Sequence, residues 1–377
     1  MTAGEKAAPA ERLTSLDVFR GLTMFLLVAE GAAVYEALSH ATSPDAPAGM
    51  LVAQFHHHPW NGLRFWDLVQ PFFMFIVGVA MPFSYSKRWE RGDSWSESFR
   101  HVAYRCLMLL LFGVGLHCGY AGKLVWELWN VLSQLSVTIL IAFLIMRMPA
   151  RRQILISLGL ILASDLAYRF WPIGELRVPG DPFVKLRNFG AFMDTILMAS
   201  DTRNSGGWVA VNAIPTAAHT IWGVLAGQLL RGSVEPLRKV KTLAVAGAVG
   251  LAVGYGMDWT GFEPIVKRIC TASFIFASGG WCLVALAFFY WLVDLKGYKR
   301  WTLFFAIVGM NPIFIYLFSE TAGKQWFNGF VAIFAQGFLG WFGVEGSAAA
   351  VLSALAVLAL EWYLCYWLYR HRILIRI

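Results

Sequence analysis

Three consecutive histidines stand immediately before a long apolar stretch. His56, His57 and His58 precede the string PWNG at residues 59–62. Neighbouring side chains of an extended chain point to opposite sides, so the three rings cannot all face one site. Histidine titrates near neutral pH and can act as a general base, a general acid or a nucleophile. The cluster therefore predicts acid–base or acyl-transfer chemistry, with a structural role in the loop or a metal site as the alternatives.

A metal site at these histidines would need further ligands. The sequence has no HxxxH or HxH-plus-acid pattern around them, and the five cysteines form no CxxC or CxxH spacing. All five cysteines lie inside or at the ends of apolar stretches, which is typical of small buried side chains. We therefore expect no metal and no disulfide framework.

Two carboxylates lie where lipid is expected. Glu30 falls in the middle of the first apolar stretch, and a buried carboxylate needs a partner or a raised pKa. We expect Glu30 to contact a ligand or to carry a proton. Asp67 lies one turn into the second stretch, where an acid complements the dipole of a helix N-terminus. It is predicted either to cap that helix or to take part in catalysis.

Other polar residues in apolar stretches have two interpretations each. His219 indicates either a substrate contact or a hydrogen bond between helices. Asn311 precedes Pro312, which interrupts the helical hydrogen-bond ladder, so Asn311 either satisfies free backbone groups or contacts a ligand. Asp17 and Arg20 lie three residues apart on one helix face. They form a pair, or Arg20 faces an anionic ligand in the cytoplasm.

A membrane-embedded chain must position these residues. The protein has 377 residues, of which 58% are hydrophobic and 14% are charged, against about 25% charged in soluble domains. Apolar stretches of about 20 residues recur, and this length matches the hydrocarbon thickness of a bilayer. The sequence predicts an all-α, polytopic integral membrane protein with about ten transmembrane helices. We expect them near residues 18–38, 65–86, 101–119, 126–146, 153–171, 208–230, 242–258, 270–293, 302–319 and 348–369.

The remaining apolar segment and the charges set the expected topology. Residues 326–342 are short and interrupted by glycine, which predicts a re-entrant or interfacial segment on the outer face, with an eleventh span as the alternative. With these spans, most of the 31 Lys and Arg residues fall on the side of the membrane that holds the N-terminus. The positive-inside rule places that side and both termini in the cytoplasm, and it explains the net charge of +8 without nucleic acid. We expect a short disordered N-terminus, residues 1–14, and one transmembrane domain, residues 15–377.

Several strings resemble a known family. They are RLTSLDVFRG at residues 12–21, HHPWNGL at 57–63, DLVQPFFMFIVG at 67–78, VDLKG at 293–297 and GMN at 309–311. With them, the sequence resembles the heparan-α-glucosaminide N-acetyltransferase family of transmembrane acyltransferases, including its bacterial NagX-like members. The resemblance covers nearly the whole chain, from about residue 12 to residue 377, and its first strings are the most specific.

The resemblance implies an enzyme that uses cytosolic acetyl-CoA to acetylate the amine of a glucosamine on the other side of the membrane. The catalytic histidine of the family lies three residues before the Trp-Asn-Gly string, a position that is His57 here. The family has an asparagine where this chain has Glu30, whose carboxylate would bind or deprotonate the ammonium of an amino sugar. The resemblance also implies a homodimer and, for a bacterial member, a place in the inner membrane.

The expected mechanism assigns further roles. His57 would act as a general base or carry the acetyl group, with Glu30 and Asp67 as the other catalytic residues. The phosphates of acetyl-CoA need basic contacts, and the cytoplasmic face has the surplus of positive charge. The expected substrate contacts are Trp60, Asn61, Asn311 and His219, and the expected acetyl-CoA contacts are Arg20, Lys87, Arg88 and Lys239.

The alternative function is an inner-membrane transporter for N-acetylglucosamine or a related sugar. Polar groups in the first, sixth and ninth predicted spans, together with broken helices, suit a sugar path. Glu30 would then couple transport to protons. A transporter needs no CoA and releases unmodified sugar, whereas the enzyme consumes acetyl-CoA and leaves an amide.

Overall fold

The computed structural model describes residues 13–198 and 203–375. Within these ranges the secondary structure is helical with no β-strand, as predicted for an all-α membrane protein. The predicted disordered segment 1–14 falls outside the described residues except for its last two positions. The α-helices are α1 (Thr14–Gly31), α2 (Val34–Ala41), α3 (Pro47–Ala53), α4 (Val69–Glu90), α5 (Trp95–Ala121), α6 (Val131–Ile145), α7 (Ala150–Phe170), α8 (Phe189–Leu197), α9 (Ala213–Arg231), α10 (Pro236–Trp259), α11 (Ala272–Phe289), α12 (Thr302–Val308), α13 (Pro312–Phe318), α14 (Asn328–Gly340) and α15 (Gly346–Arg370). The short 3-10 segments are η1 (Phe65–Leu68), η2 (Gly174–Leu176) and η3 (Ala210–Asn212), and the π-helical segments are η4 (Tyr290–Leu295) and η5 (Ser319–Phe327).

The described ranges contain six helices that are long and apolar enough to cross a bilayer. Two bent helix pairs raise that number to eight if each pair counts as one span. The prediction of a polytopic membrane protein is confirmed, but the predicted count of about ten spans is not. One reason is α6, which has 15 residues; at 1.5 Å per residue it is about 22 Å long, shorter than a hydrocarbon core of about 30 Å.

Both bent pairs break close to the candidate residues. Helices α1 and α2 meet at 61°, where Ala33 adopts a left-handed φ of 61°. Helix α12 meets the helix beginning at Pro312 at 68°, and the proline occupies the first turn of α13. Residues 326–342 were predicted as a separate re-entrant or interfacial segment. In the structure most of that segment is the end of a long helical run, Pro312–Gly340, which passes through η5 into α14 and belongs to the second bent pair. Such a pair is either a broken span or a re-entrant loop, so the re-entrant segment stays a prediction.

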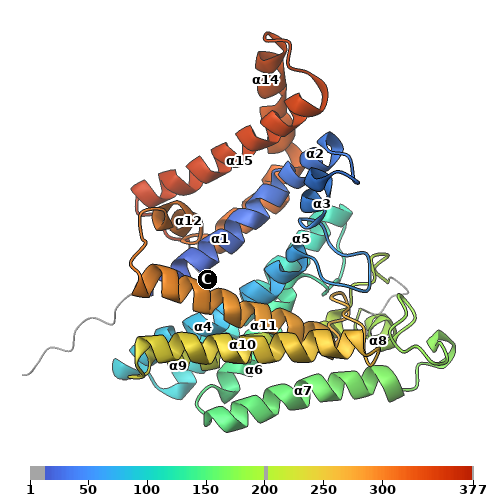
Figure 1. Cartoon of the computed structure of the whole chain (residues 1–377), viewed down its shortest axis with the longest axis vertical. Coiled ribbons are helices and arrows are strands. Elements are labelled where there is room, and N and C mark those ends of the chain that lie inside the picture. Colours follow the sequence, from blue (N-terminus) through green and yellow to red (C-terminus); the bar gives the residue numbers. More distant parts are fainter. Residues whose placement is uncertain (1–12, 199–202, 376–377) are drawn as a thin grey trace, which may run out of the picture.

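Glycines bring the central helices into backbone contact. A Cβ added at Gly78 would lie 2.1 Å from the carbonyl oxygen of Thr220, and one added at Gly223 would lie 2.2 Å from that of Phe75. Helices α4 and α9 therefore pack as closely as small residues allow. Figure 1 shows α10 and α11 side by side, with α12, α14 and α15 gathered towards the other end of the molecule. The close α4–α9 pair forms a rigid support for the residues at the start of α4.

Candidate active site

His57 and Asp67 form the central pair of the site. Asp67 belongs to the turn η1 that leads into α4, and His57 lies in the preceding loop. His57 Nδ1 is 2.8 Å from Asp67 Oδ1. Because a carboxylate accepts hydrogen bonds, this contact places the ring proton on Nδ1 and leaves the lone pair on Nε2. The His57 side chain is 35% exposed and borders a cavity, so its free nitrogen is accessible to a ligand.

Backbone groups orient the carboxylate of Asp67. Its Oδ2 accepts hydrogen bonds from the N–H of Arg64 at 2.9 Å and from the N–H of His58 at 3.2 Å. The side chain is 1% exposed. The geometry therefore fits the predicted cap at the start of the span, and the same carboxylate also orients the ring of His57.

Lys267 is the third charged group at this place. Its Nζ lies 3.3 Å from His57 Nδ1 and 3.7 Å from Asp67 Oδ1, and the side chain is buried. The ammonium also lies 5.4 Å from the ring centroid of Trp208, whose edge packs against His57. A buried ammonium needs an anionic partner, and Asp67 supplies one. We call His57, Asp67 and Lys267 the histidine cluster.

Burial and the positive charge of Lys267 lower the pKa of His57 to about 4, although Asp67 opposes the shift. Burial also lowers the pKa of Lys267 to about 8, against the opposing charge of Asp67. At pH 7 the imidazole is therefore neutral and the ammonium is charged. A neutral imidazole with a free Nε2 is able to accept a proton or to attack an acyl carbon.

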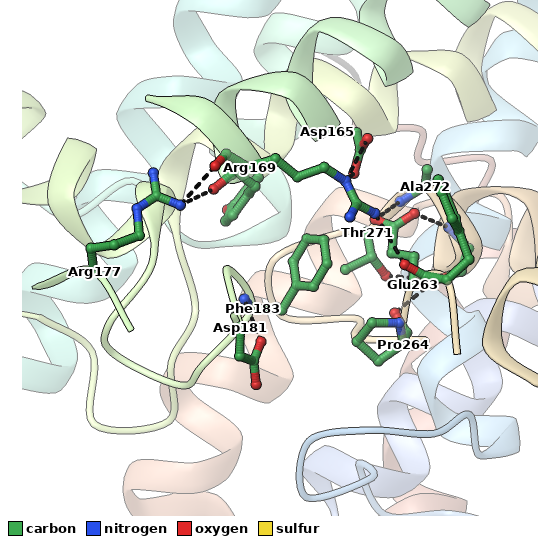
Figure 2. A network of polar contacts seen from close by, with 12 residues as sticks. Asp165, Arg169, Arg177, Asp181, Phe183, Glu263, Pro264, Thr271 and Ala272 are labelled. Carbon is green, nitrogen blue, oxygen red and sulfur yellow. Dashed lines mark hydrogen bonds and ion pairs between the residues drawn. The ribbon is translucent and has the colours of Figure 1, made fainter. Parts of the chain in front are cut away.

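A polar network ties the loop that carries Lys267 to the helices (Figure 2). The carboxylate of Glu263 accepts a hydrogen bond from the N–H of Ala272 at 2.9 Å, which caps the start of α11. Burial raises the pKa of Glu263 to about 7. Arg169 of α7 donates to the carbonyl of Phe262 at 3.2 Å, and its guanidinium lies 4.7 Å from the ring centroid of the same residue. The loop is thereby fixed at both ends.

A chain of amide side chains crosses the bundle to the same loop. Gln70 of α4 donates to Gln134 of α6. Gln134 donates in turn to Asn212 at 2.6 Å, and Asn212 donates to the carbonyl of Arg268 at 3.2 Å. Buried polar groups that satisfy one another in this way make a region rigid. The chain positions the backbone next to Lys267 relative to α4, which carries Asp67 at its start.

The histidine cluster opens onto a cavity of about 450 Å³. Its aromatic lining consists of Trp66, Phe73, Tyr120, Trp129, Trp208 and Tyr316. Glu30 from α1 and the pair Glu320 and Lys324 from η5 border the same cavity. The volume and the mixed aromatic and polar lining are typical of a site for a small molecule.

The second group of charges in this cavity forms an acidic cluster, defined as Glu30, Glu320 and Lys324. Lys324 Nζ lies 3.1 Å from Glu30 Oε2 and 2.9 Å from both carboxylate oxygens of Glu320. Tyr120 of α5 donates a hydrogen bond to Glu320. The partner that a membrane-embedded Glu30 was predicted to need is therefore Lys324.

The string PWNG after the histidines lies outside the cavity. Trp60 Nε1 donates to the carbonyl of Phe183 at 3.1 Å, and the ring packs against Gly207, where a Cβ would lie 2.6 Å from it. Asn61 is exposed. Neither of them lines the cavity. Trp60 ties the loop between α7 and α8 to the loop of His57. Their predicted substrate contact stays a prediction.

Two further candidates satisfy hydrogen bonds inside the fold. His219 Nε2 lies 2.9 Å from the hydroxyl oxygen of Ser278, joining α9 to α11. Asn311 donates to the carbonyl of Ile373 at 3.0 Å and accepts from the N–H of Ile375 at 2.8 Å. These contacts fit the structural interpretations of both residues, and neither residue lines the cavity.

Two of the basic candidates, Lys87 and Arg88, lie far from His57 along α4. Twenty residues separate Asp67 from Lys87, which is about 30 Å of helix and about one hydrocarbon thickness. Arg88, beside it, pairs with Asp93 at 3.2 Å. Arg20 lies 3.6 Å from Asp17, as the predicted pair requires.

Lys239 and two arginines border this second end of the bundle. Lys239 Nζ donates to the carbonyl of Leu230 at 2.8 Å, which ties α10 to the end of α9. A cavity of about 360 Å³ lies at the ends of α4, α6 and α9, lined among others by Arg147, Arg231 and Trp89. The guanidinium of Arg147 lies 4.9 Å from the ring centroid of Trp89. Positive charge and an aromatic face are therefore combined there.

The sequence interpretation missed several of these residues. Lys267 was not among the predicted site residues, although Lys267 and Arg268 directly precede an apolar stretch. Glu320 and Lys324 have the spacing of a pair on one helix face, which is a usable signal. Within the described residues, no group of three or more His, Cys, Asp or Glu side chains is arranged to hold a metal ion.

Comparison with known proteins supports the family resemblance. Residues 12–163 match a family model described as a domain of unknown function, DUF5009. The chain is 25% identical over 368 residues to the heparan-alpha-glucosaminide N-acetyltransferase of Homo sapiens, covering 82% of this chain and 53% of that protein. It is 24% identical over 374 residues to the Mus musculus protein of the same name, covering 84% and 54%. The chain thus has homology to these proteins along most of its length, and it spans about half of theirs.

Proposed function

We propose that this chain is a transmembrane N-acetyltransferase that moves the acetyl group of acetyl-CoA to the amine of an amino sugar. The observation that carries the proposal is the free Nε2 of a neutral His57, oriented by buried Asp67 and facing a cavity of about 450 Å³. The homology to proteins named N-acetyltransferases supports the reaction class. Glucosamine is the simplest acceptor with the required amine.

His57 has two routes to the product. As a general base, Nε2 takes a proton from the amine while the C–N bond forms and the C–S bond breaks, and then gives that proton to the sulfur of CoA. As a nucleophile, Nε2 first attacks the thioester, the C–S bond breaks and CoA leaves as the thiolate. The amine then attacks the acetyl group, the bond from carbon to Nε2 breaks, and the proton of the amine passes through the freed Nε2 to the thiolate. In both routes Asp67 holds the Nδ1 proton and stabilises the positive charge that develops on the ring.

The donor would approach from the other end of the bundle. The phosphates of acetyl-CoA need cationic contacts, and Arg20, Lys87, Arg88 and Lys239 remain the proposed set. The thioester must then reach a histidine about 30 Å away along α4. This separation supports transfer across the membrane from a cytoplasmic donor to an outer acceptor. The inner-membrane location, cytoplasmic termini and homodimer stay predictions.

The test uses the purified full chain in detergent with radiolabelled acetyl-CoA and glucosamine. We expect labelled N-acetylglucosamine from the wild type and a loss of at least about 100-fold in rate for His57→Ala. His40→Ala, which removes an exposed histidine, is the matched control and should retain activity. Label retained on the wild-type protein without acceptor, and absent from His57→Ala, would favour the nucleophilic route. No product from the wild type would overturn the proposal.

A transporter is the second candidate, and the two bent helix pairs favour it. Transporters place substrates and coupling ions at discontinuous membrane helices, and here both pairs contribute charged residues to one cavity. Flux of unmodified glucosamine or N-acetylglucosamine into proteoliposomes, in the absence of acetyl-CoA, would support transport. The same preparation tested with acetyl-CoA separates the two functions.

A further inference from the structure

The cavity has a second set of ionisable groups that the histidine chemistry does not use. Its centre is the acidic cluster, where one ammonium, Lys324, serves two carboxylates, Glu30 and Glu320. A third carboxylate, Glu361 of α15, is completely buried beside this cluster. A Cβ added at Gly323, between Glu320 and Lys324 in sequence, would lie 3.2 Å from Glu361 Oε1.

The buried carboxyl group of Glu361 distinguishes this group of residues from an ordinary ion pair. Both of its carboxylate oxygens are buried without a hydrogen-bond partner among the described residues. A buried carboxylate without a partner is costly, and the nearby Lys324 already contacts two carboxylates. Three carboxyl groups therefore lie around one ammonium, and a second cation at this place would find carboxyl oxygens that Lys324 does not contact.

The backbone around these charges is irregular in the way that functional membrane sites often are. Glu30 stands at the last turn of α1, directly before the 61° bend, and Glu320 and Lys324 lie on a π-helix. Pi-helical turns frequently occur at functional sites. Gly31 allows the two elements to touch, because a Cβ there would lie 1.9 Å from Ser319 Oγ. Irregular backbone at membrane depth is tolerated where it borders a cavity.

We propose that Glu30 and Glu320, which border the cavity, form an ammonium subsite that draws the protonated amine of the acceptor into it, with the buried carboxyl group of Glu361 behind them. An ammonium donates three hydrogen bonds and carries a positive charge. The subsite selects amino sugars over neutral sugars of the same shape. This assignment deepens the proposed function. It also rests on that function, because the amine is the acetyl acceptor only if the chain is an N-acetyltransferase.

The proton balance of the reaction requires the subsite also to accept a proton from the ammonium. A protonated amine must lose one proton before it attacks and a second as the amide forms. His57 Nε2 takes the second proton and passes it to the sulfur of CoA, so it is not available for the first. A carboxylate of the subsite accepts the first proton, which leaves the neutral R–NH2 free to turn towards the thioester. The two clusters thereby divide the two protons of one reaction.

The experiment measures binding by calorimetry at pH 6.5, with glucosamine and glucose as the probes and no acetyl-CoA. The wild type should bind glucosamine about 10-fold or more tightly than glucose, as one charge-assisted contact predicts. Glu30→Gln and Glu361→Gln should lose that preference, and Glu36→Gln, which removes an exposed carboxylate on α2, should keep it. Equal binding of the two sugars by the wild type, or an unchanged preference in Glu30→Gln and Glu361→Gln, would overturn the subsite.

Separate controls test whether each variant is folded and whether the wild type transfers acetyl groups. Size-exclusion profiles and melting temperatures show whether each variant is folded, and Glu361→Gln carries the test if Glu30→Gln is not, because Glu361 belongs to no ion pair in the described residues. Acetyl transfer by the wild type, with a sugar preference that Glu30→Gln and Glu361→Gln leave unchanged, would leave the proposed function standing without the subsite. A preference lost in these variants without any transfer by the wild type would leave the subsite standing without the enzyme.

Discussion

The histidine cluster and the acidic cluster border one cavity but are held in different ways. Asp67 receives two backbone N–H groups, and the loop of Lys267 is tied to α7 and α11. In the acidic cluster, side chains from irregular membrane helices mainly hold one another. Groups fixed by backbone keep one geometry, whereas long side chains adjust to a ligand. The difference indicates that the position of His57 is pre-organised for the proposed proton transfer, and that the side chains around Glu30 are able to adjust for the proposed ammonium binding.

Asp67→Asn is the substitution from which we expect the largest effect, because it changes the group that orients His57. An asparagine amide donates to Nδ1, so the ring proton moves to Nε2 and the base is lost. We expect acetyl transfer to fall by about 10²–10⁴-fold. Because buried Lys267 also loses its anionic partner, the melting temperature should fall as well and is measured beside the rate. The rate is measured with radiolabelled acetyl-CoA, beside Asp45→Asn as an exposed control. A rate for Asp67→Asn within threefold of the wild type would show that the hydrogen bond does not set the tautomer.

Local sequence predicted the histidine cluster in part. His57 and Asp67 are ten residues apart and share a loop and turn. The residue types pointed to the three histidines and to Asp67, and the family resemblance selected His57 among the histidines. Lys267 lies 210 residues from His57, and Lys324 lies 294 residues from Glu30. Such contacts depend on how the helices pack, which hydropathy does not encode. The direction of a side chain is equally hidden, as Trp60 shows by pointing to Phe183.

The elements of the fold also fall into those that the sequence predicted and those that it did not. Long apolar helices were predicted in place, because length and hydropathy determine them. The bounds of α15 agree within two residues, whereas α5 and α10 each begin six residues before their predicted starts. The bend after α1 has no proline to announce it, and its left-handed residue is Ala33. The π-helix η5 has the composition of any helix. These irregular parts, which carry the acidic cluster, are set by packing rather than by local pattern.

The pH dependence of kcat/KM tests the influence of Lys267 on His57, with Lys267→Met as the variant. The positive charge of Lys267 helps to lower the pKa of His57 to about 4, so its removal raises that pKa. Burial, the larger cause, remains, and the pKa should stay below the ordinary value of about 6.5. His57 is a base only when unprotonated, so the acid limb of kcat/KM should move upward from near pH 4.

The alkaline side gives a second readout for the same variant. The pKa of Lys267 is about 8, so any change in the wild-type profile caused by its deprotonation occurs near that pH and should be absent in Lys267→Met. Lys123→Met, an exposed lysine in the described chain, should reproduce the wild-type profile. An acid limb that does not move in Lys267→Met would mean that the lysine does not influence the base.

Glycine substitutions test the rigidity of the two regions with the smallest effects. A Cβ at Gly78 meets the backbone oxygen of Thr220 at 2.1 Å, which cannot move without separating α4 from α9. We expect Gly78→Ala to cost about 1–3 kcal/mol. A Cβ at Gly31 meets Ser319 Oγ at 1.9 Å and Ser319 Cβ at 3.1 Å. The hydroxyl is able to rotate, so Gly31→Ala should cost less.

Gly159→Ala on α7 is the matched control, because nothing lies within 4 Å of an added Cβ there. It should be neutral or stabilising by about 0.5–1 kcal/mol, since alanine is the better helix former. Unfolding in detergent gives the order of the three variants. If Gly31→Ala destabilised the protein as much as Gly78→Ala, the support beneath Glu30 would be as rigid as the α4–α9 pair. The acidic cluster would then be a fixed element like the histidine cluster, and ammonium binding would require a preformed geometry rather than adjustment.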